Sequence, residues 1–400
     1  MPPIEKDGSH RNRWQTGLLI AGILLIALNL RPALASVGPL IAEIRESTGL
    51  SNSLLGLLTT LPLIAFGVIS MLTTLFTRRF GIEKTLFGAL LLLSAGILVR
   101  LVHSPVALFG GTLLLGIAIA LGNVLLPTLV KRDFPDKSGS LTSLYSSMMG
   151  IGASLAAGLS VPLSDGLELG WRWTLAIWAV PALIALLVWI PQLKYNTKSD
   201  RLKSFRKAMK SLGASAKAWQ VAVFMGLQSL AFYVILAWLP DILQSRGLTE
   251  SYSGWMLSLS QGMGVLGTLL IPYLAGKRAD QRTIVWGLIA MEGLSLIAIM
   301  VTGTFGVAVW VSLLGFALGG SFGLALLFIV LRSHDTQGAT ELSGMAQSAG
   351  YILAAAGPIL IGALYDLTGS WNVPLGFLLV VLVIKAGFGH FAGKAQTVEL

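Results

Sequence analysis

A single charged residue lies in the middle of the first long apolar run of the chain, and its position suggests anion binding. Arg31 is the only ionisable residue between Gly17 and Ala42. A charge near the centre of a membrane helix costs about 2.5–3.5 kcal/mol on insertion scales, so it needs a polar partner or a water-filled cavity. Arginine is permanently cationic and carries a planar fork of five donors, which suits a flat or bidentate anion. We therefore expect Arg31 to be a central substrate-binding charge. A structural ion pair with an acid of a neighbouring helix is the alternative.

Proline follows Arg31 directly and changes the backbone beside the charge. Pro32 has no N–H, and its ring clashes with the carbonyl group one turn earlier in a helix. Backbone acceptors are therefore expected to be free next to the guanidinium, where a cavity or a neighbouring helix must satisfy them.

Other titratable residues inside apolar runs are candidates for ion coupling. Glu292 lies centrally in the ninth run and Lys385 well inside the twelfth, whereas Asp241 lies near the end of the seventh. An acid at membrane depth can relay protons, so Glu292 and Asp241 are possible coupling residues. For Glu292, a satisfied polar contact is the alternative interpretation.

Metal, cofactor and enzyme chemistry has little support in the sequence. There are no cysteines, which excludes disulfides and thiolate metal sites. The four histidines, His10, His103, His334 and His390, are too scattered for a metal cluster. No phosphate-binding loop of the Gly-x-x-x-x-Gly-Lys-Ser/Thr type is present, so ATP-driven transport is unsupported. We expect no metal, no cofactor and no enzyme activity.

Composition indicates that lipid surrounds most of the chain. Of the 400 residues, 54% are hydrophobic and only 12% are charged, against about 25% charged in soluble domains. This excludes secreted, nuclear and ordinary cytosolic proteins. The net charge of +10 does not indicate nucleic acid, because the Lys and Arg residues gather in loops on one side of a membrane.

Twelve apolar runs are each long enough to cross a bilayer, which takes about 20 helical residues. This predicts an all-α membrane protein with twelve transmembrane helices. The expected spans are 16–43, 53–77, 85–102, 105–130, 139–163, 171–192, 218–242, 252–274, 283–303, 305–331, 339–364 and 371–392.

The charges in the connectors predict how the chain is oriented. With the N-terminus inside, only four basic residues face outward: Arg45, Arg100, Arg172 and Arg246. Arg31 and Lys385 lie within spans, and every other Lys and Arg lies on the inward side. Because inward loops are enriched in Lys and Arg, both termini are expected to be cytoplasmic, in the cytoplasmic (inner) membrane of a bacterium.

A basic connector divides the chain into two halves of six spans. Residues 1–192 form the expected N-terminal half, 193–217 a cytoplasmic basic linker, and 218–400 the C-terminal half. The linker is expected either to contact anionic membrane lipids or to be an ordinary solvated loop. The halves repeat: Gly116, Gly150, Asp165 and Trp171 have counterparts about 200 positions later at Gly315, Gly350, Asp366 and Trp371. Such a parallel repeat is typical of transporters.

This architecture resembles the major facilitator superfamily, and local motifs support the resemblance. Thr77-Arg78-Arg79-Phe80-Gly81-Ile82-Glu83-Lys84 is similar to the superfamily's basic loop between spans two and three. Arg79, Phe80 and Gly81 match the loop, and the resemblance makes Arg78, Arg79 and Gly81 candidate gating residues. Arg78 replaces the acid to which the superfamily's gating ion pair is attributed.

A narrower resemblance covers nearly the whole chain. The stretch Asn29-Leu30-Arg31-Pro32-Ala33-Leu34 looks like the first helix of the cyanate permease and 2-nitroimidazole transporter branch, and Pro127 to Arg132 and Ala237 to Pro240 fit as well. Membership implies a single-chain, monomeric secondary carrier for a small anion or a small planar polar heterocycle.

In this superfamily spans 1, 4, 7 and 10 are expected to line a central cavity. The resemblance therefore gives further candidate substrate-binding residues around Arg31, namely Asn29, Asn123, Gln228, Tyr233, Trp238 and Ser321. For the polar ones, an interhelical hydrogen bond is the alternative role. None of these cavity spans carries a buried acid, so a proton-driven mechanism has no obvious carrier.

The sequence thus favours an alternating-access, secondary-active transporter of a small anionic or planar polar solute, with Arg31 at its centre. A proton-coupled exporter of drugs or metabolites with broad specificity is the alternative. A channel or a receptor without transport also remains open, although no charge ring and no signalling domain is evident.

Overall fold

The computed structural model describes residues 13–134, 137–196, 213–333 and 336–396, and within these ranges all regular structure is helical. The elements are α1 (Arg13–Asn29), α2 (Pro32–Ala35), η1 (Gly38–Leu40), α3 (Ile41–Thr48), α4 (Asn52–Phe80), α5 (Ile82–Val99), α6 (Pro105–Asp133), α7 (Ser138–Val161), η3 (Pro162–Gly166), α8 (Gly170–Ala176), α9 (Ala179–Trp189), η4 (Ile190–Tyr195), α11 (Ala216–Gln244), α12 (Glu250–Gly276), α13 (Arg282–Val301), α14 (Val307–Leu331), α15 (Thr336–Thr368) and α16 (Asn372–Gly393). Most of the basic linker predicted at 193–217 lies outside the described residues.

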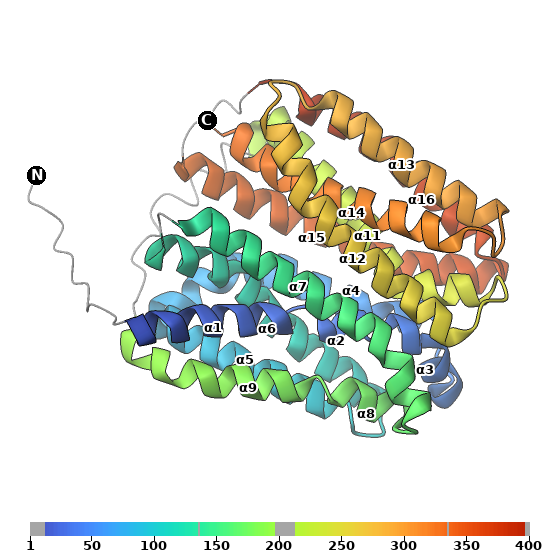
Figure 1. Ribbon diagram of the computed structural model, residues 1–400, viewed down its shortest axis with the longest axis horizontal. Coiled ribbons are helices and arrows are strands. Elements are labelled where there is room, and N and C mark those ends of the chain that lie inside the picture. The colour runs from blue at the N-terminus through green and yellow to red at the C-terminus, as the bar shows by residue number, and fades with distance from the viewer. Residues whose placement is uncertain (1–12, 135–136, 197–212, 334–335, 397–400) are drawn as a thin grey trace, which may run out of the picture.

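Twelve helical segments of the described chain are long and apolar enough to cross a membrane. The predicted all-α membrane fold with twelve spans is therefore confirmed. The segments form two bundles that lie side by side: α1 to α9 in one and α11 to α16 in the other (Figure 1). Helices α4 and α7 of the first bundle pack against α15 and α12 of the second.

The two ends of the molecule differ in the elements that lie there. The start of α1 and the end of α16 lie at one end, which we call the terminal end (Figure 1). Helices α3 and α8 lie at the other, the distal end.

The first span is broken at Arg31, as the following proline suggests. Helix α1 ends at Asn29, and α2 begins with Pro32. Arg31 itself has φ −123°, ψ −31° at the N-cap of α2. The guanidinium of Arg100 satisfies one of the carbonyl groups in this irregular stretch, with Nη1 donating to the oxygen of Ala33 at 3.1 Å. The break thus leaves Arg31 outside the regular helix, between the end of α1 and the start of α2.

Hydrogen bonds join the two bundles on the distal side. The carboxylate of Asp366, at the end of α15, accepts from the backbone N of Asn52 at 3.1 Å and of Ser53 at 2.7 Å. It also accepts from Nδ2 of Asn52 at 2.7 Å. Arg45 of α3 forms an ion pair with Asp241 of α11 at 2.6 Å. These contacts close the distal side of the interface.

Small residues allow the bundles to touch along this interface. A Cβ atom added to Gly56 of α4 would lie 2.6 Å from the carbonyl oxygen of Pro358 in α15. One added to Gly158 of α7 would lie 2.7 Å from the ring of Trp255 in α12. Such close approach of helices is the usual role of glycine in membrane interfaces.

Candidate substrate-binding site

A cavity of about 170 Å³ lies between the two bundles, on the terminal side of the contacts that join them. Its lining comes from both bundles and extends toward the terminal end as far as Leu326 of α14 and Gln347 of α15. Four carboxamides line it, those of Asn123, Gln228, Gln261 and Gln347. Tyrosine, serine and threonine side chains from both bundles and one arginine add to the polar part, and most of the remaining wall is apolar. The space fits a small organic molecule.

Arg31 is the only charged residue among the described residues that line this cavity. The break between α1 and α2 places it there, half-buried. Its Cζ lies 4.9 Å from the ring centroid of Phe232 and 6.0 Å from that of Phe322. Aromatic faces at these distances stabilise a cation without neutralising it. Within the described part of the chain no carboxylate forms an ion pair with Arg31. The structural ion pair, the alternative role considered for Arg31, is therefore not seen there.

Aromatic rings form one wall next to the guanidinium. Tyr233 is buried and packs edge-to-face against Phe66 and Phe232, with ring centroids 6.4 and 5.1 Å apart. Tyr351 packs against Phe66 at 5.5 Å. All four rings line the cavity. They provide flat, weakly polar surfaces against which a planar solute can stack.

Two of the amide residues expected at the site, Asn123 and Gln228, also line the cavity. Asn123 of α6 is half-buried. Gln228 of α11 is fully buried, and its Nε2 donates to Oγ of Ser229 at 2.7 Å. The Oε1 atom of Gln228 has no hydrogen-bond partner among the described residues.

Three residues expected around Arg31 lie elsewhere. The amide of Asn29 donates to the carbonyl oxygens of Leu25 at 2.8 Å and of Pro181 at 3.1 Å, so it links α1 to α9 instead of facing the cavity. Trp238 is fully buried, and its Nε1 donates to the carbonyl oxygen of Pro358 at 3.0 Å, a contact between α11 and α15.

Ser321 is the third of these residues. It is buried on α14 and does not line the cavity, although Phe322 next to it does. Successive helical residues point about 100° apart, so a shift of one position decides which of them reaches the cavity. The pattern of apolar runs alone cannot fix this rotation.

The two candidate coupling acids are both engaged away from the cavity. Glu292 forms a buried ion pair with Lys385, which joins α13 to α16. Asp241 is bonded to Arg45 at the distal end. Neither acid is among the residues that line the cavity.

The candidate gating loop lies at the terminal end of α4. Arg78 and Arg79 are exposed there, and Cζ of Arg79 lies 5.4 Å from the ring centroid of Phe80. Gly81 has φ +87°, and a Cβ at this position would clash with the side-chain amide of Asn196. The Nδ2 atom of Asn196 donates to the carbonyl oxygen of Phe80 at 2.7 Å. Glycine is therefore required at position 81, because its φ is positive and because a side chain there would clash with Asn196.

An ion pair that the sequence analysis missed follows this loop. Arg132, at the end of α6, bonds to Glu83 of α5 at 2.7 Å and to Asp133 at 2.7 Å. Burial acts to lower the pKa of Arg132, but the bonds and charges of Asp133 and Glu83 outweigh it and raise the pKa. The pair is internal to the first bundle, so it stabilises that bundle whether or not the bundles separate.

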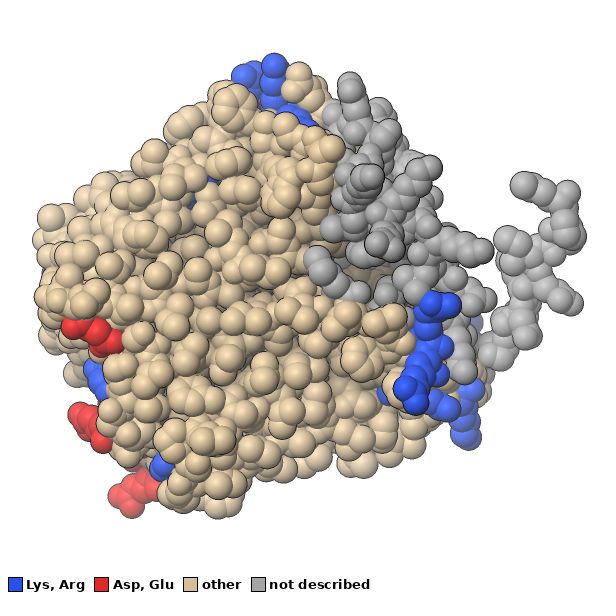
Figure 2. Space-filling view, turned by 180° about the vertical axis from the view of Figure 1, so that it is seen from behind, with Lys and Arg blue, Asp and Glu red and all other residues tan. Residues whose placement is uncertain are grey.

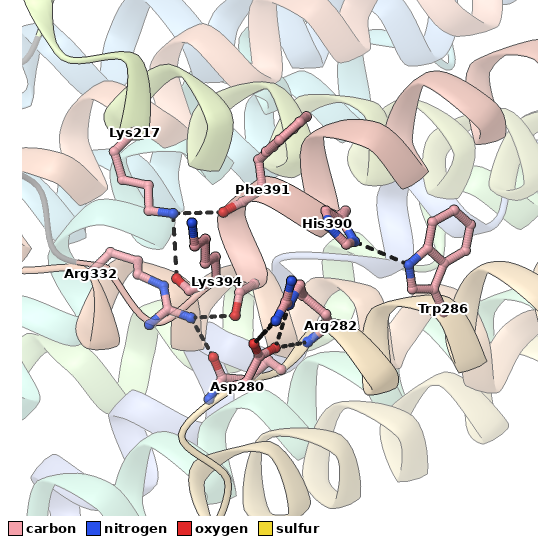
Figure 3. Close-up of polar contacts among 10 residues, drawn as sticks. Lys217, Asp280, Arg282, Trp286, Arg332, His390, Phe391 and Lys394 are labelled. Carbon is pink, nitrogen blue, oxygen red and sulfur yellow. Dashed lines mark hydrogen bonds and ion pairs between the residues drawn. The ribbon is translucent and has the colours of Figure 1, made fainter.

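At the equivalent position of the second bundle, an arginine bonds to backbone carbonyl groups. Arg332, 200 positions after Arg132, donates to the carbonyl oxygens of Ala392 at 2.8 Å and of Gly393 at 3.0 Å (Figure 3). Lys217 donates to the carbonyl oxygen of Phe391 at 2.6 Å. Cations at a helix C-terminus complement its dipole and satisfy its last carbonyl groups. Burial lowers the pKa of Arg332.

Several lining residues were not anticipated, because only spans 1, 4, 7 and 10 were considered. Gln261 lies on α12, and Gln347 and Tyr351 on α15, which also reach the cavity. Phe232 follows Gln228 by four positions on α11, and that spacing places the two on one helix face. The helical period alone therefore could have identified Phe232.

Twelve apolar helical segments of the described chain, in two bundles around a cavity that holds an arginine, define a membrane transporter. The model of the Major Facilitator Superfamily matches residues 17–358, and the chain belongs to this family. Within it, the chain falls in the branch of the cyanate and 2-nitroimidazole transporters. It is a transporter and not an enzyme.

Relatives in two bacteria cover almost the whole chain. It is 43% identical over 386 residues to the uncharacterized transporter YycB of Bacillus subtilis, which covers 96% of each chain. It is 42% identical over 382 residues to the 2-nitroimidazole transporter of Escherichia coli, over 96% of this chain and 97% of that one. It is 28% identical to the cyanate transport protein CynX of the same species, over 90% and 93% of the two chains.

Solved structures share the fold at low sequence identity. A bacterial homologue of the human lysosomal transporter Spinster, in an inward-facing and unoccupied conformation, has a TM-score of 0.75 at 15% identity. It covers 96% of this chain and 98% of its own. The D-xylose-proton symporter has a TM-score of 0.74 at 16% identity, over 96% and 99% of the two chains.

Proposed function

We propose that this transporter carries a small anionic or planar polar solute by alternating access, with Arg31 as the charge that binds it. The observation behind the proposal is the position of Arg31: half-buried in the cavity between two aromatic rings, with no acid paired to it in the described chain. Asn123, Gln228 and Tyr233 complete the proposed site. The guanidinium binds the anionic or electron-rich end of the solute, and the aromatic wall takes its flat face.

The substrates named for two relatives agree with this chemistry. Cyanate is a small anion, and 2-nitroimidazole is a planar heterocycle whose nitro oxygens carry partial negative charge. Each presents acceptor oxygen or nitrogen atoms to a planar donor fork. We propose a substrate of this kind for the present chain.

We propose that the terminal end faces the cytoplasm of a bacterium, across its inner membrane. Lys and Arg gather at that end, and the Asp and Glu residues visible in Figure 2 lie at the opposite end. Basic residues concentrate on the cytoplasmic side of membrane proteins. Because the bundles are joined at the distal side and the cavity extends toward the terminal end, the structure then represents an inward-facing form.

A proton-coupled exporter of broad specificity would place a carboxylate in the cavity, where it could bind cations and protons. The described lining contains no Asp or Glu. The anion carrier is therefore the better match to this site.

Replacement of Arg31 tests the proposal directly. In proteoliposomes, we expect Arg31→Gln to lower counterflow of cyanate or 2-nitroimidazole about tenfold to hundredfold, since a hydrogen bond to a charged group contributes about 1.5–3 kcal/mol. Arg31→Lys keeps the charge but loses the fork, so an intermediate rate is expected. Counterflow is informative because a carrier exchanges label against its own gradient, which a channel does not.

The matched control is Arg246→Gln, which removes a cation at the distal end, where Arg246 bonds to Asn372. Its counterflow should stay near the wild-type rate. Wild-type rates in folded Arg31→Gln protein would refute the role of Arg31, and transport of neither solute by the wild type would refute the substrate class.

A further inference from the structure

The carboxamide of Gln228 is bonded on one side only. Its Nε2 donates to Oγ of Ser229 at 2.7 Å and lies 3.4 Å from Sδ of Met225. A thioether sulfur can accept a hydrogen bond but has no proton to donate. The carboxamide atom next to Met225 is therefore the NH2 nitrogen, Nε2, and not the carbonyl oxygen. The group left over is the carbonyl Oε1, which is buried and has no partner in the described chain.

A buried carbonyl without a donor is unfavourable, because it has lost water and gained nothing in return. Gln228 is fully buried and lines the cavity. The described protein supplies no donor for Oε1, so a molecule in the cavity is the partner that can complete its hydrogen bonding.

The guanidinium of Arg31 lies next to the same part of α11. It faces the ring of Phe232 at 4.9 Å, and Phe232 follows Gln228 by four positions. Residues with this spacing are neighbours on one helix face, with Cβ atoms about 5–6 Å apart. A solute at this place therefore meets a charged donor and a neutral acceptor side by side.

The two groups make different demands on the solute. Arginine only donates, and the free Oε1 of Gln228 only accepts. A pure acceptor such as cyanate satisfies the guanidinium but leaves Oε1 unpaired. A heterocycle with a ring N–H next to its electron-rich group satisfies both.

We propose that Gln228 is a specificity-determining residue that selects solutes carrying an N–H or O–H donor beside their anionic or electron-rich group. This inference rests on the proposed function, because it assumes that the solute binds at Arg31. Donor-less molecules of the same size and shape are bound more weakly.

A pair of ligands that differ only in this donor tests the proposal. Isothermal titration of the purified full chain in detergent compares 2-nitroimidazole with 1-methyl-2-nitroimidazole, in which a methyl group replaces the ring proton. We expect the wild type to bind the parent compound about tenfold to hundredfold more tightly, the usual consequence of leaving a buried acceptor unpaired. In Gln228→Met, which keeps the length of the side chain but removes the carbonyl, the ratio should fall to near one.

The matched control is Ser321→Ala. Ser321 is another buried residue whose side-chain oxygen has no partner in the described chain, but it does not line the cavity. Its removal should leave the affinity ratio as in the wild type, and a ratio that collapses in this variant too would overturn the assignment to Gln228.

The remaining outcomes separate the two proposals. If the wild type binds 2-nitroimidazole and 1-methyl-2-nitroimidazole with equal affinity, the selection by Gln228 is overturned. If Arg31→Gln then binds neither compound, the proposed function is kept. A ratio that persists in Gln228→Met also overturns the role of this residue. Binding of neither compound by folded wild-type protein overturns both proposals.

Discussion

Arg31 and Arg100 show two ways in which this fold holds an arginine away from bulk water. Arg31 keeps contact with the cavity and lies between aromatic faces. Arg100 is almost completely buried, and burial lowers its pKa to about 10. It still carries its charge at neutral pH and donates to the carbonyl group of Ala33, two residues beyond Arg31. Arg100 therefore holds the broken helix that positions Arg31.

The buried pair of Glu292 and Lys385 is expected to be structural. Glu292→Ala leaves Lys385 buried without its counter-charge, which should destabilise the protein by about 3–5 kcal/mol. Replacing both residues by Met removes both charges and should restore most of the stability. Unfolding followed by fluorescence in detergent measures this, and counterflow should be near wild type in the double variant. A double variant that folds normally but no longer transports would instead assign the pair to coupling.

At the scale of helices, the two halves differ in how the equivalent helices α4 and α12 are capped at the distal end. Helix α4 is capped by its own Ser51, at 3.3 Å from the backbone N of Leu54, and in addition by Asp366 of the other bundle. Helix α12 is capped by its own Thr249, and within the described chain Asp165, the counterpart of Asp366, makes no hydrogen bond to it. A carboxylate at a helix N-terminus is favourable because it meets free N–H groups and the positive end of the dipole.

Asp366 is therefore expected to hold the distal side closed. Asp366→Ala should destabilise the closed form by about 0.5–2 kcal/mol, which corresponds to about a twofold to thirtyfold shift toward the form open at the distal end. Asp366→Asn keeps an acceptor and should shift less. Spin-label distances between α4 and α15 at the distal end measure the shift. Asp165→Ala is the control, and an equal shift in that variant would argue against a special role for Asp366.

At the scale of the whole molecule, the arrangement predicts which side reaches the cavity. Because the chain has no cysteine, a single introduced thiol reports its own access. Leu326→Cys, on the terminal side of the cavity, should react with a membrane-impermeant maleimide in inside-out vesicles but slowly in right-side-out ones.

Glu168→Cys, in the exposed distal connector between η3 and α8, is the matched control and should show the opposite preference. Reaction of both thiols from the same side would contradict the proposed orientation or the distal closure.

Much of the architecture followed from the chain alone. Apolar runs long enough to cross a bilayer fix the number of spans, because backbone groups in lipid must be satisfied within a helix. Pro32 marked the break beside Arg31, since it removes a donor wherever it stands. The rotation of each helix could not be predicted in the same way, and Asn29, Trp238 and Ser321 do not line the cavity.

The sequence by itself determined that lipid surrounds most of this protein. It also determined the twelve helices, the internal repeat and the unusual charge at Arg31. These are properties of single segments, and lipid imposes them on each segment separately. Only the tertiary structure decided which side chains share the cavity with that charge, that Glu292 meets Lys385, and that Asp366 caps a helix of the other half. Such contacts join residues far apart in the chain, and they depend on helix rotation and packing, which no local pattern encodes.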